Sequence, residues 1–458
     1  MKLADKVKSN PFPLTSLAKH ESRSTPLLRS LNGLTLLRFA QVKRNAGGIE
    51  HYLEDLNKIL LERNAMTIIQ IGLTEEIGRS DEESERIGKG NLIGMGLPMR
   101  QFEQDAPKGP KNILDKLAIK DFIRDRIIYN HFFLFFLHKF VERHNYCHSH
   151  YEAVGAGMAV REIFKQHKVD LVVLHALGGS DALEIINEAR LQGVPYSVQN
   201  HFNNSQFRHI SIREQIADAV GVGGVSNIAT PTYLTHRFVN LSDGIDTAFF
   251  TPKSVDKRNL ESGDPIVLLP ARIVQGKGHL DLIRAIEYLK REGVRITAVF
   301  AGRYDRYSEK YYEEVRVLLC ELRVSDQVLF VGELTQEKLR DWYARSKVVV
   351  LPSYSEGLPR TILEAQAMKI PVIAYDVGGV AEALQDGKTG YTVRNGDFQG
   401  LAEKLCGLMK NDNIRVQMGE AGRNFVKREF SLNALAIRHE KFYLDALSKK
   451  HSGFHKMF

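Results

Sequence analysis

The strongest constraint on the fold is a regular alternation of short apolar runs with amphipathic stretches. In the second half of the chain, β-branched and apolar runs are separated by stretches with apolar residues at helical spacing. Strands are expected at 265–271, 295–302, 327–333, 347–353 and 370–376, and helices at 278–291, 308–322, 335–345, 359–369 and 399–409. This order predicts parallel sheets joined by right-handed crossovers.

The first half of the chain shows the same alternation. Strands are expected at 33–40, 66–73, 169–179, 194–201 and 220–226, helices at 49–63, 181–192 and 207–219, and a loop over the charged stretch 74–90. A stretch of mixed polarity interrupts the pattern before it restarts, and 458 residues suffice for two or three domains. We therefore predict two facing doubly wound, Rossmann-like α/β domains with parallel sheets.

The domain boundaries follow from this interruption. The predicted division is a first domain at 1–241 with a helical insertion at about 112–145, a linker at 242–264, a second domain at 265–430, and a C-terminal helix at 431–458 that packs back on the first domain. In doubly wound domains, ligands bind beyond the carboxyl ends of the strands. The loops that follow strands therefore carry the candidate functional residues.

The composition excludes several classes of protein. Apolar residues make up 43% and charged residues 26% of the chain, as in globular proteins, and no apolar run reaches the length of a transmembrane helix. The start of the chain lacks the apolar core of a secretory signal, and three cysteines form no CxxC pair, which favours a reduced, cytoplasmic protein. A net charge of +8 suits a nucleotide, a lipid phosphate or a membrane surface. Without a nucleic-acid-binding signature, no nucleic-acid partner is expected.

The stretch SEGLPRTILEA, residues 355–365, places two carboxylates around a turn between an expected strand and an expected helix. Pro359 suits the first helical position, where its missing N–H needs no partner. The free N–H groups of such a helix N-terminus bind anions. Glu356 would then lie in the loop and Glu364 about one turn into the helix, so that both could face a hydroxylated, anionic ligand.

With these motifs in place, the chain resembles the family-4 retaining glycosyltransferases of the GT-B fold. Two elements carry most of the resemblance: Arg-x4-Lys-Gly at 272–278 and Glu-x7-Glu at 356–364. The other matching pieces lie in order along the chain, at 47–56, 169–176, 194–201, 217–227, 241–252, 351–384 and 387–393. The resemblance covers most of 33–430 and is densest in the second half.

The resemblance implies a retaining glycosyltransferase that uses a nucleotide-diphosphate sugar, linked to UDP, GDP or ADP, and a hydroxyl acceptor. Arg272 and Lys277 would bind the diphosphate and stabilise the leaving group, Glu356 would accept hydrogen bonds from the sugar, and His201 would lie near the reacting carbon. The implied catalytic set is His201, Arg272, Lys277 and Glu356. The implied substrate-binding set is Gly47, Gly48, Gly302, Gly357, Leu358, Pro359, Arg360, Thr361 and Glu364, with Glu364 on the ribose.

Several further residues are weaker candidates for a role at the site, and one cluster of histidines could suggest a metal. His175 is a weaker candidate than His201, Asp243 is expected to shape the hinge, and Asp376, Gly378, Gly379 and Glu382 resemble a loop that closes the donor site. The stretch HNYCHSH, residues 144–150, fits no standard zinc spacing. Because no Asp-x-Asp element follows a strand, we expect no metal and no cofactor.

Two alternatives stay open at this point. The chain could be a catalytically silent nucleotide-sugar-binding or scaffold subunit of an envelope-polysaccharide complex, or a phosphorylase or epimerase of the same fold; a phosphorylase would need a pyridoxal-binding lysine that no motif places. The aromatic, basic stretch 112–144 could be a core helix, or a face that lies on anionic membrane, since many relatives use lipid-linked acceptors. The acceptor is expected to be a saccharide or a lipid-linked saccharide, with the protein cytoplasmic or peripheral on the inner face of the plasma membrane. The sugar, the base and the oligomeric state stay open.

Overall fold

The computed structural model describes ten segments of the chain. They are residues 30–43, 48–74, 82–101, 151–153, 156–175, 180–201, 216–227, 238–252, 263–304 and 308–453.

The first domain is built on a nine-stranded sheet. Its strands are β1 (Thr35–Lys43), β2 (Thr67–Thr74), β3 (Glu82–Ile87), β4 (Gly90–Gln101), β5 (Tyr151–Ala153), β6 (Leu171–Leu174), β7 (Tyr196–Asn200), β8 (Gly221–Gly224) and β9 (Phe238–Asn240). They are ordered β3-β4-β2-β1-β6-β7-β8-β9, with β5 paired to β4. All pairs are parallel except β3–β4 and β4–β5.

The expected loop at 74–90 is wrong for residues 82–87, which form β3. This strand pairs only with β4 among the described strands, in a hairpin with Ile87 opposite Gly90. The two-residue turn includes Gly88, whose φ of 56° lies in the left-handed region that such hairpin turns require. A strand at the edge of a sheet can expose its side chains to solvent. The charged sequence of β3 therefore shows no hydrophobic pattern from which a strand could be predicted.

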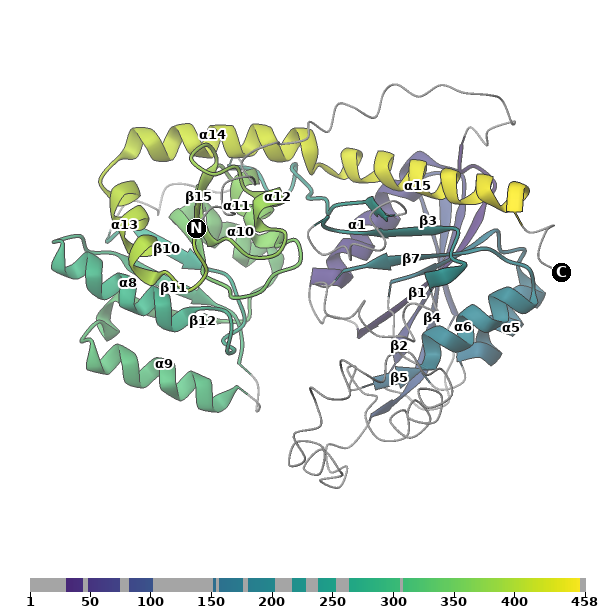
Figure 1. The fold of residues 1–458 in the computed structure, drawn as a ribbon, viewed down its shortest axis with the longest axis horizontal. Helices are drawn as coiled ribbons and strands as arrows, with labels where there is room; N and C mark the ends of the chain where they lie inside the picture. The colour runs from purple at the N-terminus through teal and green to yellow at the C-terminus, as the bar shows by residue number, and fades with distance from the viewer. Residues whose placement is uncertain are drawn as a thin grey trace, which may run out of the picture.

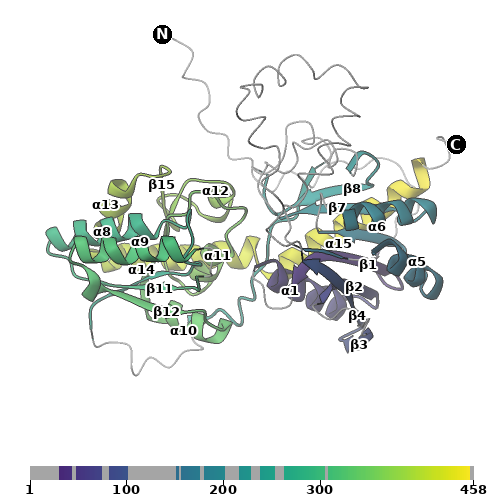
Figure 2. The same cartoon turned by 90° about the horizontal axis from the view of Figure 1, so that it is seen from below.

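Helices cover both faces of the first sheet. The described helices are α1 (Gly48–Arg63), α5 (Ala156–Gln166) and α6 (Ser180–Leu191). One core contains the apolar residues of α5 and α6 and alternate residues of β1, such as Leu37 and Phe39. The opposite core contains Leu36 and Ala40 with α1 and with α15 (Leu432–Gly453), the last helix of the chain. Figures 1 and 2 show α15 lying along the first domain.

The second domain contains a six-stranded sheet that is parallel throughout. Its strands are β10 (Ile266–Leu269), β11 (Thr297–Ala301), β12 (Val328–Gly332), β13 (Ser346–Leu351), β14 (Val372–Tyr375) and β15 (Gly390–Val393). The order is β12-β11-β10-β13-β14-β15. The winding direction therefore reverses between β10 and β13, and the loops after these two strands flank the reversal point, where such folds bind ligands.

The helices of the second domain also lie on both faces of its sheet. They are α8 (His279–Arg291), α9 (Glu309–Glu321), α10 (Gln336–Arg345), α11 (Arg360–Ala367), α12 (Val380–Ala383), α13 (Phe398–Met409) and α14 (Asp412–Glu429), with a short 3-10 helix at Ser325–Gln327. Two apolar clusters fill the space on either face. Helix α14 lies on this domain and α15 on the other (Figure 1), so the chain crosses between the domains at Phe430–Ser431. The predicted architecture of two doubly wound α/β domains is confirmed.

Candidate functional site

The structure brings Lys277 and Glu356 into direct contact at the reversal point of the second sheet. Lys277 lies in the loop between β10 and α8, and Glu356 in the loop between β13 and α11. The Lys277 Nζ donates to Glu356 Oε1 at 2.6 Å, and the two side chains are 25% and 13% exposed. An ammonium and a carboxylate, separated by 79 positions in the sequence, thus share one place at the carboxyl edge of the sheet.

The backbone holds these two loops tightly together. Gly278 has a φ of 73°, and a Cβ built on it would lie 2.0 Å from the carbonyl oxygen of Pro352. The Tyr354 N–H donates to the carbonyl oxygen of Gly276 at 2.9 Å. Glycine is therefore required at 278 both by conformation and by the closeness of the neighbouring loop.

Replacing Gly278 by alanine is expected to destabilise the protein and to separate the two loops. The new methyl group cannot occupy the space that the Pro352 carbonyl fills, so the backbone must shift. Gly293→Ala is the matched control, because Gly293 has a φ of 71° but nothing within 4 Å of its built Cβ. Thermal denaturation should show a loss of about 1 kcal/mol for the control, from the positive φ alone, and a clearly larger loss for Gly278→Ala. Equal losses would contradict the close approach.

Arg272 and Gly302 lie beside the same edge. Arg272 follows β10, and its side chain is exposed. A Cβ built on Gly302, directly after β11, would lie 2.1 Å from the carbonyl oxygen of Ala271 and 2.9 Å from the Cα of Arg272. Gly302 therefore allows the loop after β11 to lie against the loop that carries the arginine.

The residues after Glu356 form the start of α11. Pro359 is the N-cap rather than the first helical residue expected from the sequence, and the helix begins at Arg360. A one-residue difference of this kind is common at helix ends. Leu358 and Pro359 are buried, and Thr361 is half-buried. The Gly357 carbonyl accepts a hydrogen bond from the Gly379 N–H at 2.7 Å, which fixes the turn before the helix.

Glu364 is buried behind this turn, with a tyrosine and an arginine beside it. Its Oε2 accepts a hydrogen bond from the Tyr343 hydroxyl at 2.9 Å, and its Oε1 lies 4.0 Å from Arg360 Nε. Burial raises the pKa of Glu364, against the opposing effects of Arg360 and Tyr343. One carboxylate oxygen is thus engaged by protein, while the other lies beside the guanidinium.

The Arg360 side chain joins the two domains, which the sequence did not reveal. Its guanidinium donates to Asp55 Oδ2 on α1 at 2.8 Å and to Asp243 Oδ1, shortly after β9, at 2.8 Å, and the side chain is 10% exposed. Burial raises the pKa of both aspartates, although Arg360 acts in the opposite direction. The resemblance placed Arg360 in the substrate-binding set, and no sequence pattern indicated this contact between the domains.

A second contact between the domains lies at Glu382 on α12. Its Oε1 accepts a hydrogen bond from the Ser226 hydroxyl at 2.6 Å, and its Oε2 accepts one from the Asn240 side-chain amide at 2.7 Å. Ser226 follows β8 and Asn240 ends β9, so both donors belong to the first domain. Glu382, which the sequence placed in a donor-site loop, here ties that loop to the opposite domain.

His201 lies directly after β7, with its backbone carbonyl against Gly357 of the second domain. A Cβ built on Gly357 would lie 3.0 Å from the backbone oxygen of His201. His201 Nε2 lies 2.8 Å from Nδ1 of His175, which follows β6, and the Tyr52 ring on α1 packs edge-on against His201. Burial, with Arg38 nearby, lowers the pKa of His201 to about 4, so its ring is neutral at physiological pH.

The same buried network reaches the last helix of the chain. His439 Nδ1 lies 3.0 Å from the carbonyl oxygen of Leu435, and because a carbonyl only accepts, Nδ1 carries the proton. Its Nε2 therefore accepts from the Tyr52 hydroxyl, at 2.7 Å. Burial lowers the pKa of both His175 and His439 well below the usual value.

These buried histidines predict that the protein loses stability in acid. In the unfolded chain each histidine takes up a proton below about pH 6.5, whereas the folded protein resists protonation, so each site costs up to about 1.4 kcal/mol per pH unit below that point. His439→Gln, which cannot take up this proton, should show a shallower fall in unfolding free energy between about pH 6.5 and 4. Denaturant titrations of both proteins across this range measure the difference in slope. The carboxylates are the same in the two proteins, so their protonation changes the unfolding free energy equally in both. Parallel pH curves would contradict the assignment.

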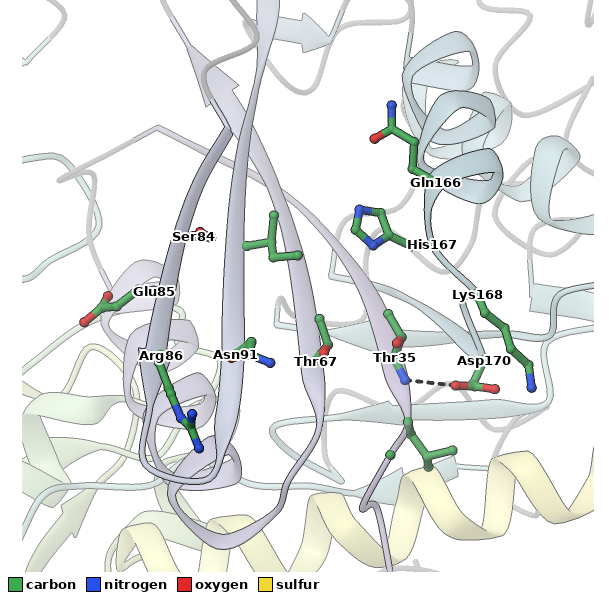
Figure 3. A pocket seen from close by; sticks show the side chains of 13 residues that line it. Thr35, Thr67, Ser84, Glu85, Arg86, Asn91, Gln166, His167, Lys168 and Asp170 are labelled. Atoms are coloured by element: carbon green, nitrogen blue, oxygen red, sulfur yellow. Dashed lines mark hydrogen bonds between the residues drawn. The ribbon is translucent and has the colours of Figure 1, made fainter.

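A separate cavity lies at the opposite edge of the first sheet. Its volume is about 750 Å³, and its lining includes Thr35, Thr67 and Asn91 at the amino ends of β1, β2 and β4, together with Lys168 and Asp170. Figure 3 shows these side chains around the ends of the strands, with Asp170 accepting a hydrogen bond from the Thr35 N–H at 2.9 Å. This cavity is remote from the carboxyl-edge loops and contains none of the predicted site residues.

Some predicted features lie outside the described residues. These are Gly47, the aromatic stretch 112–144, the HNYCHSH stretch, and most of the expected helix at 207–219. Gly48 is the first residue of α1. Among the residues that the structure describes, no cluster of three or more His, Cys, Asp or Glu side chains could hold a metal ion, and none of the helices has the length and apolarity to cross a bilayer.

Comparison with known proteins connects this geometry with a family. Residues 250–425 match the family model for glycosyl transferases group 1. The chain is 28% identical over 225 residues to the capsular polysaccharide biosynthesis glycosyltransferase CapM of Staphylococcus aureus, covering 48% of this chain and 57% of that protein. It is 26% identical over 305 residues to a GDP-mannose-dependent alpha-(1-6)-phosphatidylinositol monomannoside mannosyltransferase of Mycobacterium tuberculosis, covering 61% and 77% of the two chains. The match thus spans little more than half of the capsular relative.

The fold extends the match to nearly the whole chain. The crystal structure of Anabaena HepE in complex with UDP superposes with a TM-score of 0.64, over 89% of this chain and 98% of that one, at 15% identity. At this identity the likeness concerns the fold, which is GT-B. The chain therefore has the GT-B fold, and its residues 250–425 match the model of the group 1 glycosyl transferases.

Proposed function

We propose that this protein is a retaining glycosyltransferase that moves a sugar from a nucleotide-diphosphate sugar to a hydroxyl acceptor. The observation that carries the proposal is the contact between Lys277 and Glu356 at the reversal point of the second sheet, where Gly357 of the Glu356 loop lies against the His201 carbonyl. A diphosphate needs cations, and the attached sugar needs hydrogen-bond acceptors. Here one of each lies side by side at the edge where doubly wound sheets bind ligands.

The contact between Lys277 and Glu356 gives each residue a role when the donor arrives. The diphosphate would draw the Lys277 ammonium from the carboxylate, and Glu356 would then accept from sugar hydroxyls. Arg272 and the free N–H groups at the start of α11 would add positive potential. These groups act most strongly as charge grows on the leaving diphosphate, so they stabilise the transition state more than the bound donor.

In the proposed reaction, one bond to the anomeric carbon replaces another. The bond from this carbon to the diphosphate oxygen breaks, and the acceptor oxygen forms a bond to the same face of the sugar. The acceptor proton passes to the departing phosphate, so atoms and charge balance without a protein base. The neutral His201 would lie near the reacting carbon as a hydrogen-bonding group. Because Arg272 and Lys277 supply the cations, we expect turnover without added divalent metal or a cofactor.

The acceptor class is part of the proposal. The relatives named above act, by their names, in capsular polysaccharide biosynthesis and on a phosphatidylinositol mannoside. We infer that the acceptor here is a lipid-linked saccharide or a precursor of a cell-envelope polysaccharide. An excess of +8 charges would favour peripheral binding to anionic lipid on the cytoplasmic side of the membrane.

The test combines binding with product analysis. UDP-, GDP- and ADP-linked sugars are added to the purified protein, and the donor that raises the melting temperature identifies the base. Release of the nucleoside diphosphate with an acceptor present would then be followed, and NMR of the product would give its anomeric configuration. Product with the configuration of the donor sugar supports the proposal. Binding without turnover for every acceptor tested would point to a silent binding subunit, and an inverted product would contradict the retaining mechanism.

A further inference from the structure

One buried carboxylate connects the two loops that carry Lys277 and Glu356. Asp281 lies in the first turn of α8 and is 4% exposed. Its Oδ2 accepts two hydrogen bonds, from the Tyr354 hydroxyl at 2.6 Å and from the Tyr375 hydroxyl at 2.8 Å. Its Oδ1 accepts from the Arg284 guanidinium at 2.9 Å. No motif in the sequence points to Asp281 or to the two tyrosines.

The position of Tyr354 explains why this contact matters for the site. Tyr354 lies two residues before Glu356, and Asp281 four residues after Lys277. Tyr354 is 46% exposed, and its ring packs edge-on against the ring of Tyr375. Its backbone N–H donates to Gly276, and its hydroxyl donates to the helix that follows the lysine loop. The hydroxyl is therefore the side-chain group that connects the Glu356 loop to that helix.

We propose that Asp281 and Tyr354 are positioning residues that hold the Glu356 loop against the Lys277 loop, so that the ammonium and the carboxylate meet the donor in fixed relative positions. This inference rests on the proposed function, since it concerns the donor site. Neither residue needs to touch the donor. The hydrogen bond joins a hydroxyl to a carboxyl oxygen at 2.6 Å, the short distance of the stronger contacts that a loop side chain can form.

The protonation of the tyrosine supports this role. The hydrogen bond to Asp281, together with burial, raises the pKa of Tyr354 to about 12. The hydroxyl therefore remains a donor throughout the pH range in which the protein would work. The contact does not depend on a proton that is gained or lost near neutrality.

Tyr375 provides a matched control for Tyr354. It donates to the same carboxylate oxygen but lies on β14, fully buried, and belongs to neither loop. Tyr354→Phe and Tyr375→Phe each remove one hydroxyl and one hydrogen bond to Asp281 Oδ2. A purely structural role for Asp281 predicts similar consequences for the two variants, whereas positioning predicts a difference at the site.

The experiment compares the two variants in the full chain with three measurements. Melting temperature reports stability, hydrogen exchange of the amides in 352–358 reports the loop, and calorimetry reports affinity for whichever of UDP, GDP or ADP the wild type binds. We expect both variants to melt earlier. Only Tyr354→Phe should speed exchange in 352–358 and weaken nucleotide binding, by about tenfold, as expected for one lost hydrogen bond to a charged group.

A conservative substitution at the other end of the contact completes the test. Asp281→Asn keeps an oxygen that can accept from both tyrosines, so it should retain more nucleotide affinity than Asp281→Ala. Equal exchange and equal affinity in the two tyrosine variants would overturn the positioning role, while the proposed function would stand if the wild type binds nucleotide. If the wild type binds none of the nucleotides, the proposed function fails and the positioning role falls with it, even where exchange shows that Tyr354 tethers the loop.

Discussion

Replacing Lys277 by alanine is expected to lower the rate of sugar transfer by about 10²- to 10³-fold, the range seen when one preorganised charge-stabilising group is removed from an active site. The ammonium lies 2.6 Å from Glu356 and is partly exposed, so it can exchange this partner for a diphosphate. The loss should appear mainly in kcat, because charge on the leaving group is largest in the transition state. Donor affinity should weaken as well, but by less.

The fold should survive this substitution. A second lysine of the same domain provides the control for the loss of a positive charge. Lys290, in the last turn of α8, donates to the Arg323 carbonyl at 2.7 Å and is exposed. Lys290→Ala removes the same charge from the same domain but leaves the site unchanged, so its transfer rate should match the wild type. Wild-type transfer by Lys277→Ala would refute the assignment of the diphosphate site, and so would equal losses in the two variants.

Replacing Arg360 by alanine is expected to lower the free energy of unfolding by about 3 kcal/mol, because it leaves buried carboxylates without their cation. Asp55 and Asp243 each contact the guanidinium at 2.8 Å, and Glu364 lies 4.0 Å from it. Since these three carboxylates come from α1, the segment shortly after β9 and α11, the loss should also loosen the two domains relative to each other. Chemical denaturation measures the first effect, and small-angle scattering of the free protein measures the second.

Two comparisons separate the effect of the Arg360 contacts with Asp55 and Asp243 from a general loss of charge. Arg316→Ala removes an arginine whose partner Glu313 is exposed, and it should change the unfolding free energy by less than about 1 kcal/mol. Adding Asp243→Asn to Arg360→Ala should recover part of the lost stability, because it neutralises one stranded carboxylate. Equal stability of Arg360→Ala and Arg316→Ala would contradict a stabilising role of the Arg360 contacts. So would a double variant that is less stable than Arg360→Ala by as much as Asp243→Asn alone destabilises the wild type.

The architecture of the second domain could be predicted from the sequence because its strands β10, β11, β13 and β14 are largely buried on both faces. Runs such as 348–351 consist of valine and leucine alone, and the helices between such runs keep one apolar face. The antiparallel strand β3 escaped prediction for the opposite reason, since an exposed edge strand can be charged. The sequence patterns also do not predict helix α5 or strand β15.

Some contacts of the candidate site could likewise be predicted from the sequence, and others could not. The shared location of Lys277 and Glu356 follows from the rule that the carboxyl ends of neighbouring parallel strands meet at one edge. The Arg360–Asp55 pair joins positions 305 residues apart and belongs to the packing of two domains, for which the sequence carries no local pattern. The Tyr354–Asp281 contact likewise depends on the side-chain geometry of two adjacent loops. Each of these residues, taken alone in the sequence, is an ordinary polar residue of a loop or helix.

The most direct test of the central claim is calorimetric titration of the wild type and Lys277→Ala with a nucleoside diphosphate and with the matching nucleoside. We expect UDP, GDP or ADP to bind the wild type much more tightly than uridine, guanosine or adenosine does, and Lys277→Ala to lose most of this difference. Nucleoside and diphosphate binding equally well, or an undiminished preference for the diphosphate in Lys277→Ala, would contradict a diphosphate site between the Lys277 and Glu356 loops.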